Sequence, residues 1–141
     1  MSVIYDLEEN FTIYNSEIET LKPIIEDWLR QNDFTVKTDL PARVRNHLIC
    51  ADRNCRRGIG MRPKIRNLQI IFTQNDKETE MSVKIIGFRH RNKYDYWTIL
   101  VRLFSHLRNR LEDKGIDQIM DHLMNEEYNK YLETRGKILL K

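Results

Sequence analysis

The chain has 141 residues, of which 40% are hydrophobic and 32% charged. This length and composition are typical of one soluble globular domain, which we expect to span residues 1–141, and they exclude a wholly disordered chain. The formal net charge is +3, and its positive part lies in residues 43–93, which hold 13 basic and 4 acidic side chains. A basic block of this kind favours a polyanionic partner.

The N-terminal sequence MSVIYDLEEN is acidic, and the chain contains no run of eighteen apolar residues. A signal peptide needs a basic region before an apolar one, and a membrane helix needs about 20 apolar residues. We therefore expect a cytoplasmic protein that makes no membrane contact. Two cysteines, Cys50 and Cys55, are too few for a disulfide framework.

The first predicted element is a helix. Ser16, followed by a glutamate three residues later, forms a capping-box pattern, and apolar residues then recur at helical spacing from Ile18 to Trp28. We expect this helix to end near Asn32. Pro23 lies inside the pattern, which predicts either a later start or a kink.

From Phe34 onward, apolar and polar residues alternate, which predicts strands. A tight turn is expected at Pro41. We expect these strands to form an antiparallel meander in which each strand has one apolar face, as in a sheet covered on one side only. The four expected strands cover residues 34–40, 44–50, 67–72 and 81–85.

Residues 95–114 and about 117–135 again carry apolar residues at helical spacing, and Gly115 is expected to end the first of these helices. The predicted fold class is therefore α+β. It has an N-terminal helix, a four-stranded antiparallel β-meander, and two C-terminal helices packed on one sheet face.

The stretch RNCRRGIGMRPKIR, residues 53–66, contains five arginines and one lysine. In the predicted meander, this loop and the segment after the fourth strand lie at the same end of the sheet. A cationic surface of this kind is typical of proteins that bind single-stranded nucleic acid. The candidate nucleic-acid-binding residues are Arg43, Arg45, Arg53, Arg56, Arg57, Arg62, Lys64, Arg66, Lys84, Phe88, Arg89, Arg91, Lys93 and Tyr94.

The sheet face without helices is expected to carry polar residues together with several isoleucines. Ile49, Ile65, Ile86 and Phe88 should gather toward the basic residues, where bases of a single strand could rest. The alternatives are a plain solvated face or a dimer interface.

No motif in the chain names a reaction. Gly58-Ile59-Gly60 is too short for a dinucleotide-binding loop, and the phosphate-binding P-loop pattern does not occur. His47, Cys50, Cys55 and His90 lack zinc-ligand spacing, because His47 and Cys50 would point to opposite faces of one strand. We therefore expect neither a metal nor a cofactor.

Two carboxylates close to the basic stretch, Asp52 and Asp95, could in principle hold Mg²⁺ for phosphodiester cleavage. Each also has an ordinary interpretation, as an ion-pair partner or as a helix-start acid. The sequence thus predicts a non-enzymatic protein that binds single-stranded DNA or RNA. The alternative is a protein-interaction module, a homodimer through the exposed sheet face or the last helix, and a Mg²⁺-dependent nuclease is less favoured.

Overall fold

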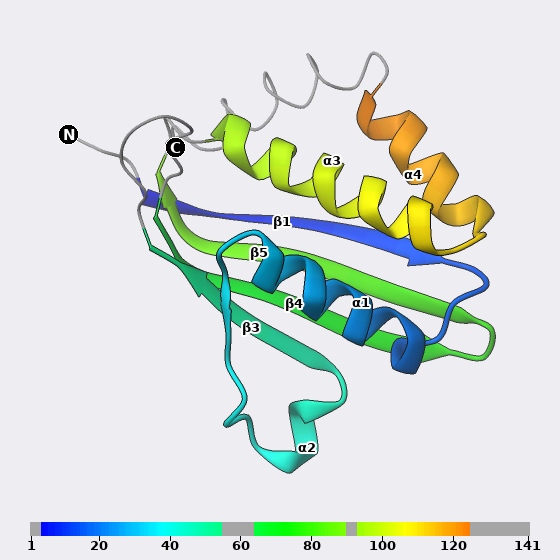
Figure 1. Cartoon of the computed structure of the whole chain (residues 1–141), viewed down its shortest axis with the longest axis horizontal. Helices are drawn as coiled ribbons and strands as arrows, with labels where there is room; N and C mark the ends of the chain where they lie inside the picture. Colours follow the sequence, from blue (N-terminus) through cyan, green and yellow to red (C-terminus); the bar gives the residue numbers. More distant parts are fainter. Residues whose placement is uncertain (1–3, 55–63, 90–92, 125–141) are drawn as a thin grey trace.

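The computed structural model describes residues 4–54, 64–89 and 93–124. The five strands in these ranges form one antiparallel sheet in the order β1-β5-β4-β3-β2 (Figure 1). The predicted α+β class with an antiparallel sheet is confirmed. The elements are β1 (Ile4–Ile13), α1 (Ile18–Gln31), β2 (Thr35–Val36), α2 (Ala42–Arg45), β3 (Leu48–Arg53), β4 (Ile65–Asn75), β5 (Glu78–Arg89), α3 (Lys93–Arg110) and α4 (Lys114–Met124).

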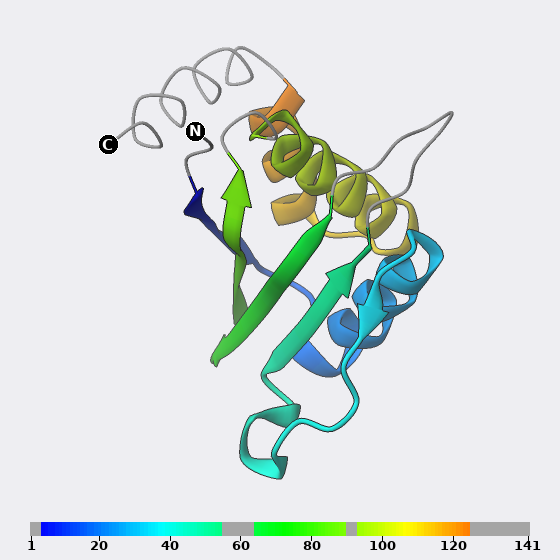
Figure 2. The same ribbon diagram turned by 90° about the vertical axis from the view of Figure 1, so that its left-hand side faces the viewer.

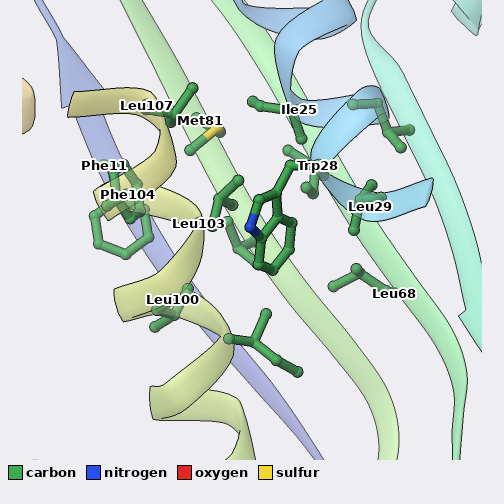
Figure 3. Packing of buried hydrophobic residues seen from close by; sticks show 14 of the residues in the cluster. Phe11, Ile25, Trp28, Leu29, Leu68, Met81, Leu100, Leu103, Phe104 and Leu107 are labelled. Carbon is green, nitrogen blue, oxygen red and sulfur yellow. The ribbon is translucent and has the colours of Figure 1, made fainter. Parts of the chain in front are cut away.

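Three of the helices, α1, α3 and α4, lie on the same side of the sheet, and α2 lies beyond the start of β3 (Figures 1 and 2). The core fills the space between these helices and the sheet. Trp28 of α1 and Leu103 of α3 both belong to this core (Figure 3). The Phe11 ring lies 4.6 Å from the Phe104 ring, centroid to centroid. The buried Tyr96 hydroxyl donates a hydrogen bond to the carbonyl of Val83 at 2.8 Å, which ties α3 to β5.

The strand β1 corrects the predicted strand count, since the sheet has five strands in the described chain and not four. β1 pairs along its length with β5 and places Leu7, Phe11 and Ile13 in the core. The alternation that marks a strand is broken by Glu9, which pairs with Val83 on the core side and is half-buried. The acidic composition of the segment hid its strand character.

The second predicted strand, residues 44–50, is wrong in its first half. Residues Ala42–Arg45 form the short helix α2, in which the Val44 and Arg45 N–H groups donate to the Pro41 carbonyl at 3.0 Å. Pro41 stands at the N-cap, because its fixed φ suits the approach to a helix. The preceding strand β2 contains only two residues.

Two bulges shift the registry at one end of the sheet. Ala51 pairs with Leu68 but Arg53 pairs with Ile65, so β4 carries one extra residue. In the same way Tyr5 pairs with Phe88 and Leu7 with Ile85, and the extra residue lies in β5 next to Gly87, which has a φ of 74°. Glycine adopts this left-handed conformation without a steric penalty.

The helix boundaries after the sheet differ from the prediction. α3 ends at Arg110, and Gly115 lies in the first turn of α4 and does not end a helix. A Cβ atom at Gly115 would come within 2.8 Å of Tyr14 Cδ2 and 3.2 Å of the Thr12 carbonyl oxygen. The glycine therefore permits α4 to pack closely on the end of β1. The predicted continuation of the last helix to about 135 lies outside the described residues.

The predicted start of α1 at Ser16 is close to the observed one. α1 begins at Ile18 and continues through Pro23. α1 ends at Gln31, and Asp33, two residues further on, adopts the left-handed conformation with a φ of 69°. The Phe34 N–H donates to the Leu29 carbonyl at 2.9 Å. This is the hydrogen-bond pattern of a Schellman motif, which turns the chain from α1 into β2.

Candidate nucleic-acid interface

The end of β3, the start of β4 and the end of β5 lie at one end of the sheet, because Arg53 pairs with Ile65 and Asn67 pairs with Ile86. α3 starts at Lys93, shortly after this point (Figure 1). The predicted juxtaposition of these chain segments is confirmed at the level of the backbone. We call this region the basic end and define it by the backbone positions of Arg53, Lys64, Arg66, Arg89 and Lys93.

Lys64 and Arg66 are exposed at the start of β4. Neither side chain makes a hydrogen bond or an ion pair with another residue in the described parts of the chain, where the salt bridges found all lie within α1. Their positive charges are therefore available to an anionic ligand. Among the other candidates, Arg56, Arg57, Arg62 and Arg91 lie outside the described residues, as do the side chains of Phe88, Arg89, Lys93 and Tyr94.

Arg53 differs from these residues because it is buried. Only 7% of it is exposed, and its guanidinium carbon lies 4.9 Å from the centroid of the Phe34 ring. Its pairing with Ile65 places it on the helix-covered side of the sheet. Arg53 therefore stabilises the fold through a cation–π contact and is not part of the exposed basic surface.

Arg43 and Arg45 are exposed on α2, at the opposite end of β3 from the basic end (Figure 1). Arg45 donates from Nε and Nη2 to the Leu40 carbonyl at 3.4 and 3.1 Å. The structure thus separates both arginines from the basic end, because they belong to the helix α2 and not to a strand.

Among the described side chains, most of the predicted apolar strip does not lie on the uncovered face, and the Phe88 side chain lies outside the described residues. Ile49 and Ile65 are each only 1% exposed and belong to the core, Ile65 because the β4 bulge reverses its side. Ile86 is half-buried on the uncovered face near the basic end. Ile71 is 39% exposed but pairs with Leu48, toward the opposite end of the sheet.

The uncovered face carries charges of both signs. Lys84 pairs with Gln69 on one side and with Glu8 on the other, and Glu80 lies further along β5. The Glu8 carboxylate accepts a hydrogen bond from Ser82 Oγ at 2.9 Å. Acidic groups along β1 and β5 therefore oppose a polyanion on this part of the face.

The residues considered for a metal do not come together in the described chain. No group of three or more histidine, cysteine or acidic side chains there could hold an ion. His47 lies in the turn between α2 and β3, and Cys55 and His90 lie outside the described residues. Burial raises the pKa of the Cys50 thiol, only partly offset by the positive charge of Lys37, so this cysteine is protonated at neutral pH.

The possible nuclease pair lies only partly within the described side chains. Asp52 is half-buried and pairs with Thr35 of β2, and the side chain of Asp95 lies outside the described residues.

No family model matches the chain, and no curated protein matches its sequence. Of the described helices, none is both long and apolar enough to cross a membrane.

Proposed function

We propose that this chain is a non-enzymatic protein that binds single-stranded DNA or RNA at the basic end. The observation that carries the proposal is the meeting of the β3, β4 and β5 termini at one end of the sheet. The two chain segments that adjoin the basic end, residues 53–66 and 89–93, contain nine basic and no acidic residues. Such a concentration of positive charge attracts phosphates and releases their counterions.

A single strand is favoured over a duplex by the surface beside the basic end. Asn67 and Ile86 pair across β4 and β5, and both are half-buried, so an amide and an apolar side chain border the cationic region. Unstacked bases can rest on such a surface, whereas a duplex presents mainly phosphates. Glu8 and Glu80 confine this contact to the part of the face next to the basic end.

Fluorescence anisotropy with a labelled single-stranded oligonucleotide tests the proposal. We expect Lys64→Glu/Arg66→Glu to weaken binding by about tenfold or more and to make the slope of log affinity against log salt shallower. The matched control is Arg43→Glu/Arg108→Glu, which changes the net charge equally at exposed sites on α2 and the end of α3. Equal losses in the two variants, or no binding by the parent at low salt, would contradict the proposal.

A second candidate function is dimerisation through the uncovered face. The exposed Ile71 and its half-buried partner Leu48 form a small apolar surface there. The molar mass from light scattering after size exclusion distinguishes the two functions. A dimer that is lost in Ile71→Glu but kept in Lys64→Glu/Arg66→Glu would favour the interaction module. Incubating the oligonucleotide with protein and Mg²⁺ should leave it intact, and cleavage would instead favour the nuclease.

A further inference from the structure

A small groove lies between α1, β2 and α2, apart from the basic end. Its volume is about 180 Å³, below the roughly 300 Å³ at which ordinary small-molecule sites begin. Its lining residues include the apolar Val36, Leu40 and Leu48, the cationic Lys22, Lys37 and Arg45, and the acidic Glu26.

The cationic residues of the groove differ in how their charges are used. Lys22 Nζ donates to Glu26 Oε1 at 3.1 Å, so this pair is locally neutral. Lys37 is exposed, and its side chain has no hydrogen-bond or ion-pair partner within the described ranges. The groove therefore keeps an excess of positive charge beside its apolar lining.

Arg45 is held in place by a contact that leaves it charged. Nε and Nη2 donate to the Leu40 carbonyl, at 3.4 and 3.1 Å, while a guanidinium has five N–H donors. Because a carbonyl carries no net charge, the guanidinium is positioned without being neutralised. Planar guanidinium groups suit planar carboxylates, and a lysine adds a point charge that is free to adjust.

We propose that this groove binds a small organic carboxylate, with its charged head between Lys37 and Arg45 and its apolar body against Val36 and Leu40. The limited volume selects a body of about one ring or a short chain, since larger ligands need larger sites. The site does not depend on the proposed nucleic-acid binding, because its residues come from the opposite end of β3.

Benzoate is the test probe, added to the ¹⁵N-labelled full chain and followed by amide chemical shifts. We expect saturable shifts in residues 37–40 and 45–49. Benzamide, which has nearly the same shape without the charge, and inorganic phosphate, which has charge without the ring, should each bind at least about tenfold more weakly.

Single substitutions identify the residues responsible. Lys37→Gln and Arg45→Gln should each weaken benzoate binding by about tenfold, and Arg43→Gln, two residues from Arg45 but outside the groove, should leave it unchanged. Arg45→Gln also loses the Leu40 contact, so Lys37→Gln decides the outcome if the other variant unfolds. Equal binding of benzamide, an equal loss in Arg43→Gln, or shifts confined to residues 64–66 would overturn the proposal.

Discussion

Ser16 Oγ donates a hydrogen bond to Asp113 Oδ2 at 3.0 Å, which joins the approach to α1 with the start of α4. The same carboxylate accepts from the Asn15 N–H at 2.9 Å, and its other oxygen accepts from the Gly115 N–H at 2.9 Å. Asp113 is only 3% exposed. One buried side chain thus caps α4 and fixes the β1–α1 connection.

Replacing Asp113 by Ala should lower the free energy of unfolding by about 3 kcal/mol, because it leaves three donors without their acceptor and removes a helix cap. Ser16→Ala removes a single donor and should cost about 1 kcal/mol. Urea denaturation measures both. Asp117→Ala, an exposed acid of the first turn of α4, serves as control. If Asp113→Ala is no more destabilising than this control, the carboxylate does not join the two segments.

Arg53→Ala should destabilise the protein by about 1–3 kcal/mol, because it removes the cation–π contact with Phe34 and the packing of a buried side chain. The neighbouring exposed Arg66→Ala should change the stability by less than about 0.5 kcal/mol. Thermal unfolding compares the two variants. A stable Arg53→Ala protein that has lost oligonucleotide affinity would show that Arg53 contacts the ligand instead.

Gly115→Ala should destabilise the fold by about 1–3 kcal/mol, although the same change in an open helix stabilises by about 1 kcal/mol. The added Cβ would meet Tyr14 Cδ2 at 2.8 Å and the Thr12 carbonyl oxygen at 3.2 Å. Tyr14→Ala in the same protein should recover part of the loss, since the backbone contact remains. Urea denaturation gives the sign of the change in the free energy of unfolding. A Gly115→Ala protein that is more stable than the parent would show that α4 has room to shift.

His106 should make the fold less stable as the pH falls. Its burial, reinforced by the charge of Arg110 on the same helix, lowers its pKa below 6.5, while Asp27 on α1 partly opposes the shift. Below pH 6.5 the unfolded chain therefore binds a proton that the folded chain resists, so stability is lost from about pH 6.5 down through the folded-state pKa.

The variant His106→Gln isolates this effect, because the other titrating groups contribute equally to both proteins. Melting temperatures measured from pH 7.5 to 5 should fall more steeply for the parent than for His106→Gln. Parallel curves would mean that this imidazole is protonated as easily in the folded protein as in the unfolded chain.

The strongest sequence patterns predicted the parts of the fold that they covered. Apolar and polar residues alternate around Phe72 and Met81, apart from Ile71 and Ile86, and the antiparallel order of β3, β4 and β5 was enough to place the basic segments at one end of the sheet. The strand β1 was missed because Glu9 interrupts its apolar face. A one-residue bulge reverses which side a residue faces, so alternation alone could not place Ile65 in the core.

The sequence predicted where the candidate site lies but not which basic residues belong to it. Arg43, Arg45 and Arg53 have the same composition signal as Lys64 and Arg66. Arg43 and Arg45 lie apart because they belong to a four-residue helix, and Arg53 is buried against the Phe34 ring. Composition encodes neither feature. Charge counts therefore identify a region, whereas the exposure of each arginine depends on packing that only the three-dimensional structure provides.

The pairing of β1 with β5 has a consequence for synthesis on the ribosome. Leu7 pairs with Ile85, so the first strand has no sheet partner until nearly the whole sheet has been translated, a delay of several seconds at about 5–20 residues per second. Leu7, Phe11 and Ile13 remain uncovered by the sheet during that time. The acidic residues Glu8 and Glu9 between them discourage pairing between nascent chains, and they keep this role when the same strand becomes an edge strand of the finished sheet.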